Sequence, residues 1–239
     1  MQAVILAGGR GTRLAPYTMV FPKPMLPVGG QPIIETIVRQ LAYYGFTDII
    51  ISLGYLGKLI KLYFEDKSKV PDGVEIRYCF EDIPLGTAGA IGLIENLEDD
   101  FLVINGDILT TLDYRKFIEF HKSEESNLTI AVGKKEVTLS LGILDIDKDN
   151  NVLGIHEKPT YTYNDNMGIY TYNRKTLDYI KRNKRLDLNV LVENMIAGNE
   201  RVLAYKSDDS FYWIDIGKHA DFEKANSEFE NRKDEFLKA

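Results

Sequence analysis

Apolar and polar positions along the first half of the chain predict strands and helices in alternation. Residues 2–6 and 48–53 are almost continuous apolar runs, which is typical of strands buried on both faces of a sheet. Between them, residues 32–44 place apolar side chains at helical spacing, and Gly45 suits the helix end. Similar patterns predict helices over residues 57–65, 87–97 and 113–124 and strands over residues 74–80 and 101–105. This alternation predicts a mostly parallel sheet with helices on both faces.

Strand-like runs follow one another more closely in the second half. They predict strands over residues 127–132, 141–147, 151–157, 166–173, 201–206 and 212–216, and short helices over residues 177–180 and 188–195. The DKDNN sequence at residues 147–151 is typical of a hairpin turn. We therefore expect a mixed sheet in this half, continuous with the sheet of the first half.

The last predicted element is a polar helix that begins at residue 218 and runs to the end of the chain. It carries a sparse apolar stripe of Phe222, Ala225, Phe229 and Phe236. We expect this stripe to pack on the protein's own core rather than to form a dimer contact. The fold class expected from all these patterns is α/β, with a Rossmann-like, mostly parallel sheet and helices on both faces.

Composition and charge narrow the classes of function. At about 150 residues per domain, 239 residues suit one large domain. The net charge of −7 argues against a nucleic-acid partner, which needs a basic face. No apolar run approaches the roughly 20 residues of a membrane helix, and residues 1–11 lack signal-peptide features. With Cys79 as the single cysteine, no disulfide framework is possible, and a cytoplasmic protein without a membrane partner is expected.

A glycine-rich segment, LAGGRGTRL at residues 6–14, directly follows the first predicted strand. Adjacent glycines allow backbone N–H groups to approach phosphates closely. Arg13 adds a permanent charge that can hold two phosphate oxygens at once. A tight strand-to-helix turn would contain the same glycines. The segment matches neither the P-loop pattern GxxxxGK[ST] nor the dinucleotide pattern GxGxxG.

Three further charged residues have chemistry suited to phosphates or metal ions. Lys23 lies between two prolines, which hold it in a rigid segment. Asp107 follows the apolar run 101–104, at the strand end where open α/β sheets bind ligands. Asp215 lies at the end of another predicted strand, and carboxylates are ligands that suit Mg²⁺. Each residue taken alone could equally be a solvated lysine or a turn aspartate.

A second polar group is predicted at strand ends in the later half. Glu157 and Lys158 end one strand, and Asn166 begins another. A glutamate can accept hydrogen bonds from sugar hydroxyls, and a lysine can hold a phosphate. An exposed ion pair at a strand end is the simpler interpretation of the first two residues.

Taken in order, these motifs resemble those of the sugar-phosphate nucleotidyltransferases, the family that makes nucleotide sugars. The family signatures LAGGxGTRLxPxT and PKPxxP are similar to residues 6–18 and 22–27. The later motifs follow in the same order at PLGTAG (84–89), NGD (105–107), EKP (157–159), NMGIY (166–170) and WIDIG (213–217). The resemblance is collinear from residue 2 to about residue 225. Its motifs look most like those of the mannose- and heptose-1-phosphate guanylyltransferases.

The resemblance implies a glycosyltransferase-A-like catalytic domain over residues 1–239. Its nucleotide-binding half would reach about residue 110, and a sugar-phosphate-binding half would span about residues 111–225. The reaction implied joins a nucleoside triphosphate to a sugar 1-phosphate, giving a nucleotide sugar and pyrophosphate. Such chemistry depends on positioning and charge neutralisation, which suits a chain without an obvious activated nucleophile. A monomer or a homodimer is expected.

The same resemblance implies a set of site residues. The nucleotide would be bound by Leu6, Ala7, Gly8, Gly9, Gly11, Thr12, Arg13, Lys23, Glu81, Leu85, Gly86, Thr87, Asn105 and Asp107. The sugar phosphate would be bound by Gly142, Glu157, Lys158, Asn166 and Asp215. The catalytic residues would be Arg13, Lys23, Asp107, Lys158 and Asp215, of which Asp107 and Asp215 would hold Mg²⁺.

Departures from the family pattern concern the choice of substrate. Leu141 replaces a frequent tyrosine, and Met167 is bulkier than the usual alanine or threonine beside the sugar. Residues 85–89 favour GTP with a mannose- or heptose-type sugar, and UTP, dTTP or CTP with another sugar is the alternative. A non-catalytic nucleotide-sugar-binding protein is the alternative of another class. It is disfavoured because Arg13 and both metal-type aspartates are present.

Overall fold

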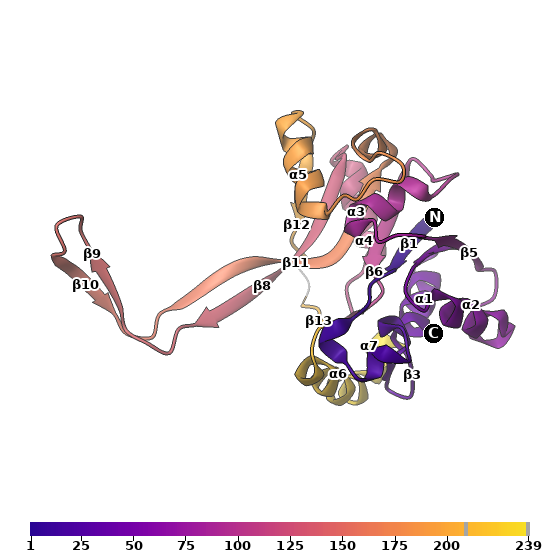
Figure 1. Ribbon diagram of the computed structural model, residues 1–239, viewed down its shortest axis with the longest axis horizontal. Helices are drawn as coiled ribbons and strands as arrows, with labels where there is room; N and C mark the ends of the chain where they lie inside the picture. Colours follow the sequence, from indigo (N-terminus) through magenta and orange to yellow (C-terminus); the bar gives the residue numbers. More distant parts are fainter. Residues whose placement is uncertain (208–209, 238–239) are drawn as a thin grey trace.

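A central sheet organises the computed structural model, which describes residues 1–207 and 210–237. Among these residues the sheet has seven strands in the order β12-β8-β11-β6-β1-β4-β5 (Figure 1). Their bounds are β1 Gln2–Ala7, β4 Asp48–Leu53, β5 Glu75–Phe80, β6 Asp100–Asn105, β8 Leu128–Thr138, β11 Thr160–Asn173 and β12 Val202–Tyr205. Strands β5, β4, β1 and β6 are parallel, whereas β11 is antiparallel to both β6 and β8. The prediction of one continuous, mixed α/β sheet is confirmed.

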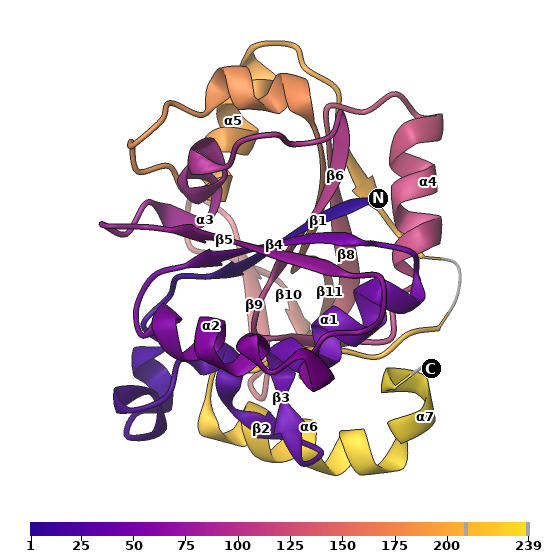
Figure 2. The same cartoon turned by 90° about the vertical axis from the view of Figure 1, so that its right-hand side faces the viewer.

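Side-chain alternation along the strands divides the apolar interior into two cores. Ile5 and Ile51 face one core, and Val4 and Ile50 face the other. The first core is covered by α1 (Ile33–Tyr43), α2 (Gly57–Glu65), α4 (Tyr114–Ser123), α6 (His219–Asn231) and α7 (Lys233–Phe236), and the second by α3 (Gly86–Gly89) and α5 (Leu188–Ala197) (Figure 2). Helices therefore cover both faces, as predicted.

Several short elements connect this framework. Strand β7 (Ile108–Thr110) pairs with β13 (Trp213–Asp215), and β2 (Pro27–Val28) pairs with β3 (Gln31–Pro32). The 3₁₀ helices are η1 Thr12–Leu14, η2 Tyr17–Met19, η3 Lys23–Met25, η4 Lys67–Lys69, η5 Ala90–Leu93 and η6 Arg174–Tyr179. Within residues 1–207 and 210–237, no helix has the length and apolarity needed to cross a membrane.

The helix predicted over residues 87–97 is wrong in its extent. The structure has only the short α3 followed by η5, which ends at Leu93. Gly89 packs so tightly that a Cβ there would lie 2.6 Å from the carbonyl oxygen of Lys184. Backbone N–H groups of Ala88 and Gly89 both donate to the Leu186 carbonyl, at 3.0 and 2.9 Å. Close backbone packing therefore fixes this segment, and its glycines weaken a regular helix.

The predicted C-terminal helix is divided into α6 and α7 at Arg232. Ala225, Phe229 and Phe236 are fully buried, and the rings of Phe229 and Phe236 stack at 5.3 Å. The prediction that this stripe packs on the protein's own core is confirmed. Residues 238–239, which the predicted helix also included, lie outside the described residues.

A two-stranded extension leaves the body of the molecule between β8 and β11 (Figure 1). We call residues 133–165 the β-arm. The strands β8 and β11 pair from Gly133↔Asp165 to Thr138↔Thr160. Beyond them, β9 (Ile143–Ile146) and β10 (Val152–His156) form a hairpin at the tip. The predicted strands 127–132 and 166–173 are thus much longer in the structure, because side chains on the β-arm face solvent and show no buried face in the sequence.

Candidate active site

The glycine-rich loop leaves the carboxyl end of β1 and is shaped by close backbone packing. A Cβ on Gly54 would lie only 2.6 Å from the carbonyl oxygen of Gly8, so the two loops meet through glycine backbone. Gly11 has a φ of 60°, the left-handed region that glycine adopts without strain. Its carbonyl accepts a hydrogen bond from the Thr18 hydroxyl at 2.8 Å. The turn into η1 then presents Arg13.

Predicted nucleotide-binding residues from several chain segments line one cavity of about 280 Å³. These residues are Leu6, Gly8, Gly9, Glu81, Gly86, Thr87, Asn105 and Asp107, and the lining is completed by Pro84, Ala90 and Asp187. Two other predicted residues, Ala7 and Leu85, are buried in the core. Gly11, Thr12, Arg13 and Lys23 continue along the loop and the segment that packs against it. Parallel strand ends thus gather most of the predicted nucleotide set at one edge of the sheet.

Glu81 ties the two sides of this cavity together. Its carboxylate accepts hydrogen bonds from the Leu85 N–H and the Ser52 hydroxyl, both at 3.1 Å. A Cβ on Gly8 would lie 2.4 Å from the same carboxylate. Glu81 therefore fixes the loop before α3 against β4 and also borders the glycine-rich loop.

A lysine and two carboxylates form the charged centre of the site. The antiparallel pairing of β7 with β13 places Asp215 opposite Ile108, next to Asp107. The Lys23 ammonium donates to Asp107 and lies 3.5 Å from Asp215. Lys23 is only 9% exposed, so the three charges interact in a partly desolvated setting, where each interaction is stronger than in water.

The electrostatics of this centre fit a divalent cation. Burial and the neighbouring Asp107 raise the pKa of Asp215, and Lys23 partly offsets both effects. The carboxylates of Asp107 and Asp215 repel each other, so they attract a cation in addition to Lys23. Mg²⁺ is commonly held by one or two carboxylates together with substrate phosphates. Among the described residues, no group of three or more His, Cys, Asp or Glu side chains could hold a metal ion, so substrate oxygens would have to complete the coordination.

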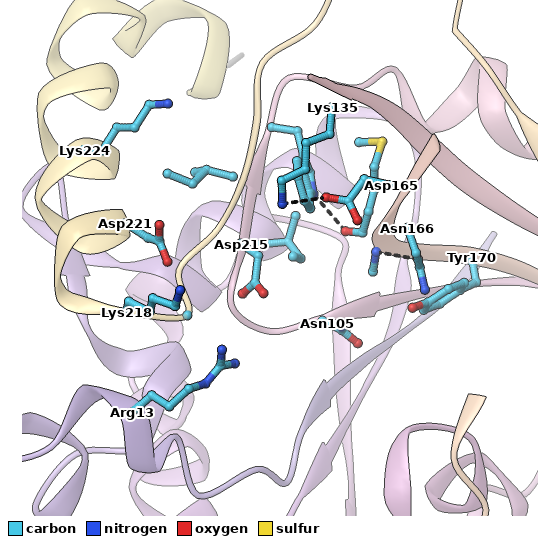
Figure 3. Close-up of a pocket in the computed structure, with 16 residues that line it drawn as sticks. Arg13, Asn105, Lys135, Asp165, Asn166, Tyr170, Asp215, Lys218, Asp221 and Lys224 are labelled. Carbon is cyan, nitrogen blue, oxygen red and sulfur yellow. Dashed lines mark hydrogen bonds and ion pairs between the residues drawn. The ribbon is translucent and has the colours of Figure 1, made fainter. Parts of the chain in front are cut away.

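A larger, more polar pocket of about 500 Å³ adjoins this centre (Figure 3). The predicted residues Arg13, Asn105, Asn166 and Asp215 line it. Further lining residues that the sequence prediction missed are Lys135, Asp165, Tyr170, Trp213, Lys218, Asp221 and Lys224. Four of the lining side chains are cationic and three, Asp165, Asp215 and Asp221, are anionic. The cationic side chains suit a ligand with phosphate groups.

Asn166 is held in place by its own turn. Its side-chain oxygen accepts the Gly168 N–H at 3.0 Å, and Gly168 has a φ of 72°. A Cβ on Gly168 would lie 2.6 Å from the Asn105 amide nitrogen, so glycine is required where β11 passes β6. Burial raises the pKa of the nearby Tyr170 hydroxyl to about 12. The Tyr170 hydroxyl is therefore a neutral hydrogen-bonding group at pH 7.

Met167 does not fill the pocket in the way its size suggests. It is almost fully buried, and its backbone carbonyl accepts the indole N–H of Trp213 at 2.8 Å. A Cβ on Gly133 would lie 3.7 Å from the Met167 side chain. The side chain therefore packs against the glycine at the base of the β-arm, which accommodates its extra volume.

Three residues of the predicted sugar-phosphate set lie on the β-arm instead. Gly142 and Glu157 are neighbours there, since a Cβ on Gly142 would lie 3.1 Å from the Glu157 carboxylate. Lys158 follows at the bend that leads into β11. In the described part of the chain, neither cavity is lined by any of these three residues. The structure thus separates them from Asn166 and Asp215.

The missed residues left only weak signals in the sequence. Lys218, Asp221 and Lys224 recur every three residues just after the WIDIG motif, and Lys218 precedes the first turn of α6 while Asp221 and Lys224 lie within the helix. That spacing was a usable signal. Lys135 and Asp165 lie 30 positions apart and form an ion pair at 3.2 Å through the pairing of β8 with β11. Only knowledge of the strand register could have joined them.

Comparisons with known proteins agree on the family but not on the nucleotide, since the UTP--glucose-1-phosphate uridylyltransferase of Synechocystis sp. is also 32% identical, covering 94% of this chain and 62% of that protein. A family model described as nucleotidyl transferase matches residues 2–232. The chain is 30% identical to the mannose-1-phosphate guanylyltransferase of Mycobacterium tuberculosis, covering 95% of this chain and 64% of that protein. It is 31% identical to the D-glycero-alpha-D-manno-heptose 1-phosphate guanylyltransferase of Aneurinibacillus thermoaerophilus, covering 97% and 99%.

A solved structure agrees with these sequence matches. HddC from Yersinia pseudotuberculosis superimposes with a TM-score of 0.71 at 34% identity, covering 95% of this chain and 99% of that one. The chain thus spans about two thirds of the mycobacterial protein's length and nearly all of the two shorter relatives. The match over residues 2–232 includes both cavities, and the chain belongs to the nucleotidyl transferase family.

Proposed function

We propose that this protein is a sugar-1-phosphate nucleotidyltransferase, which joins a nucleoside triphosphate to a sugar 1-phosphate and releases pyrophosphate. The observation that carries the proposal is the juxtaposition of two cavities around one charged centre. Asn105 borders both cavities, Asp107 lines one and Asp215 lines the other. Glycine backbone in the first cavity suits a nucleotide, and the cationic side chains of the second suit a phosphorylated sugar.

In the proposed reaction, a phosphate oxygen of the sugar 1-phosphate attacks the α-phosphorus of the nucleotide. A new P–O bond forms while the bond from the α-phosphorus to the bridging oxygen breaks, and pyrophosphate leaves with that electron pair. The protein's task is positioning and charge neutralisation. Arg13 and Lys23 would neutralise the phosphate oxygens on which charge accumulates. The backbone of Gly8 and Gly9 would border the nucleotide.

Asp107 and Asp215 would hold Mg²⁺ in this proposal. Bound there, the ion would supply positive charge to the phosphate oxygens of the substrates. Lys23 keeps the two carboxylates close together, so the chain itself preorganises the pair.

We propose GTP and a mannose- or heptose-type sugar 1-phosphate as the substrates. The support comes from the PLGTAG segment at residues 84–89 and from the names of the two guanylyltransferases that match this chain. Leu85 is buried, while Gly86 and Thr87 line the smaller cavity. The backbone of this segment is therefore placed where it could hydrogen-bond a base edge, the kind of contact that discriminates between bases.

The test is a grid of reactions that reads pyrophosphate release. GTP, UTP, dTTP, CTP and ATP are each combined with several sugar 1-phosphates and Mg²⁺, with and without EDTA. We expect release with one nucleotide and one sugar type, abolished by EDTA. Nucleotide binding without release across the grid would overturn the proposal in favour of a non-catalytic binding protein.

A pair of arginine variants sharpens this test. Arg13→Ala should lower turnover by at least ~10²-fold, the typical effect of removing one charge-stabilising donor. Arg182→Ala is the matched control, because Arg182 is exposed and pairs with Glu95 outside both cavities. Equal activity of the two folded variants would contradict the role assigned to Arg13.

A further inference from the structure

The tip of the β-arm presents an apolar face to solvent. Register pairs Leu144 with Ile155 and Ile146 with Val152, which places these four side chains on one face of the hairpin. All four are between 52% and 67% exposed. On the opposite face, His156 contacts Asp145 at 2.7 Å. A two-stranded hairpin is marginal in water unless its apolar face is covered, so this face requires a partner surface.

A second exposed apolar surface lies beside α6, a helix that contributes lining residues to the larger pocket. Tyr17, Met19, Val20 and Phe21 are between 48% and 67% exposed, and we call these four side chains the rim patch. The Tyr17 ring packs against His219 and Phe222 of α6. Asp221 and Lys224 of α6, and Lys218 directly before it, line the pocket. An apolar element seated on the rim patch would therefore lie next to the pocket.

In this structure the β-arm holds its tip away from the rim patch of its own chain (Figure 1). The strand register runs without a break from Gly133↔Asp165 to Thr138↔Thr160 and shifts only at the base of the β-arm, between Asn166 and Tyr170. Asn166 lines the pocket, and Thr160 lies six residues further along β11. At about 3.3 Å per residue, the start of β11 is roughly 20 Å from Asn166. Glu157 and Lys158 lie beyond that point.

We propose that two copies of this chain exchange their β-arms in a two-fold dimer. Each apolar tip covers the rim patch of the other subunit and brings Glu157 and Lys158 beside that subunit's pocket. A two-fold dimer uses the same pair of complementary surfaces twice, so both tips and both rim patches are covered in a closed assembly. The role of Glu157 and Lys158 as sugar-phosphate ligands rests on the proposed function, whereas the exchange itself rests on the β-arm geometry.

The bend at Lys158 suits this arrangement. Lys158 has a φ of 45°, although the proline that follows favours extended backbone at this position. The N–H of Leu139 donates to the carbonyl of Pro159 at 3.0 Å, which closes the bend across the two strands. This bend holds Lys158 in one position relative to the ladder. A residue that acts in another subunit's site needs such a fixed position.

A mixed dimer whose two subunits carry different substitutions tests whether the β-arm of one subunit acts in the active site of the other. A subunit with Asp107→Asn and a differently tagged subunit with Lys158→Ala are co-expressed, and the mixed species is isolated through both tags. The assay uses a sugar 1-phosphate concentration well below the wild-type KM, at which each variant alone has low activity. If β-arms act in the partner, one of the two sites in the mixed dimer combines an intact body with an intact β-arm, and about half of the wild-type turnover per dimer returns. Activity no higher than that of the single variants would overturn the proposal.

A matched control reverses the expected outcome. Here both substitutions are in one subunit, which is paired with a wild-type subunit. If the β-arms are exchanged, one site contains Asp107→Asn in its body and the other receives the Lys158→Ala β-arm. Both sites are then defective, so activity is lost. A β-arm that acts in its own chain leaves the wild-type subunit intact and about half of the activity present. The two mixed species therefore give opposite results under the two arrangements.

The association itself is read by solution mass, independently of activity. Light scattering should give twice the subunit mass of 27.2 kDa for the wild type. Leu144→Asp together with Ile155→Asp should give a monomer, whereas His156→Gln on the other face of the hairpin should leave the dimer. A monomeric wild type overturns the proposal. Failure of the proposed function would appear differently, as a dimer without pyrophosphate release for any substrate pair.

Discussion

The carboxyl edge of the sheet and the β-arm share the motifs of one family, but they are built in opposite ways. At the sheet edge, buried parallel strands end side by side, and Gly8 and Gly54 pack backbone to backbone. In the β-arm, two antiparallel strands leave the body and expose both faces to solvent. The first arrangement fixes Asp107 and Asp215 within one chain. The second leaves the position of Glu157 and Lys158 to whatever surface covers the β-arm.

This contrast shows what collinear motifs can and cannot imply. Strand ends in one parallel sheet must meet, so motif order leads directly to a site. Two strands that leave the sheet together stay close to each other but are free of that constraint. Residues such as Gly142 and Glu157 remain neighbours on the β-arm, even though the pocket to which the family signature assigns them is elsewhere.

The largest expected effect is at the sheet edge. Asp107→Ala should lower turnover by at least ~10²-fold, equivalent to about 2.7 kcal/mol of transition-state stabilisation. The substitution removes one of the two carboxylates that share Lys23. Steady-state pyrophosphate release measures the loss. Asp99→Ala is the control, since Asp99 is an exposed residue that pairs with Arg174, and equal effects of the two substitutions would refute the assignment.

The next largest expected effect distinguishes a β-arm that binds the sugar 1-phosphate from a body that binds the nucleotide. Lys158→Ala should raise KM for the sugar 1-phosphate by roughly 10- to 100-fold, because a hydrogen bond to a charged group contributes about 1.5–3 kcal/mol. KM for the nucleotide should stay within about twofold. Lys148→Ala, at the turn between β9 and β10, is the control. A larger effect on the nucleotide than on the sugar phosphate would place Lys158 in the wrong part of the site.

A pair of glycine substitutions compares the packing of the two regions. Gly54→Ala should lower the free energy of unfolding by about 1–3 kcal/mol, because its Cβ would press on the Gly8 carbonyl. Gly154→Ala on the β-arm should change it by less than ~0.5 kcal/mol, since the nearest atom to its Cβ, an Asp145 oxygen, is 3.5 Å away. Urea unfolding measures both. Similar losses in the two variants would contradict the contrast in packing.

The smallest expected effect is the acid sensitivity of a buried histidine in the body. Burial lowers the pKa of His121 below its ordinary value, against the opposing effect of Asp100. The unfolded chain therefore binds the proton more readily, and stability present above pH 6.5 is lost as pH falls through the lower folded pKa. The slope from one such group is below ~1.4 kcal/mol per pH unit.

Urea unfolding between pH 7.5 and 5.5 measures this slope. His121→Gln should flatten it, because the variant has no imidazole to protonate in the core. Lys148→Ala, at the turn between β9 and β10, is the control and should leave the slope of the wild type. An unchanged slope in the His121 variant would show that another group controls the acid response.

Elements with a buried face were predicted most accurately. The predicted bounds of β4 and α2 agree with the structure residue for residue, since their apolar spacing reflects the core they cover. Strands β8 and β11 were predicted too short. Charged residues such as Lys134, Lys135 and Glu136 lack the apolar alternation that indicates a strand packed on a core. Strand β7 was missed because three residues are too few to show a period.

The candidate site was partly accessible from the sequence for a related reason. Arg13, Lys23, Asp107 and Asp215 are in motifs whose chemistry is visible in the residues themselves. Lys135, Lys218 and Lys224 are ordinary surface-type lysines in the sequence, and only the fold makes them line one pocket.

The sequence by itself determined the α/β class, the order of the strands and helices along the chain, and the family to which the motifs point. The class and the element order follow from periodicity and residue chemistry, which are local properties, and the family follows from the resemblance of the motifs. The tertiary structure decided which strands are neighbours, that β7 and β13 bring Asp107 and Asp215 together, and that residues 133–165 leave the body. Such features depend on register and on surfaces far apart in the sequence, so no local pattern contains them.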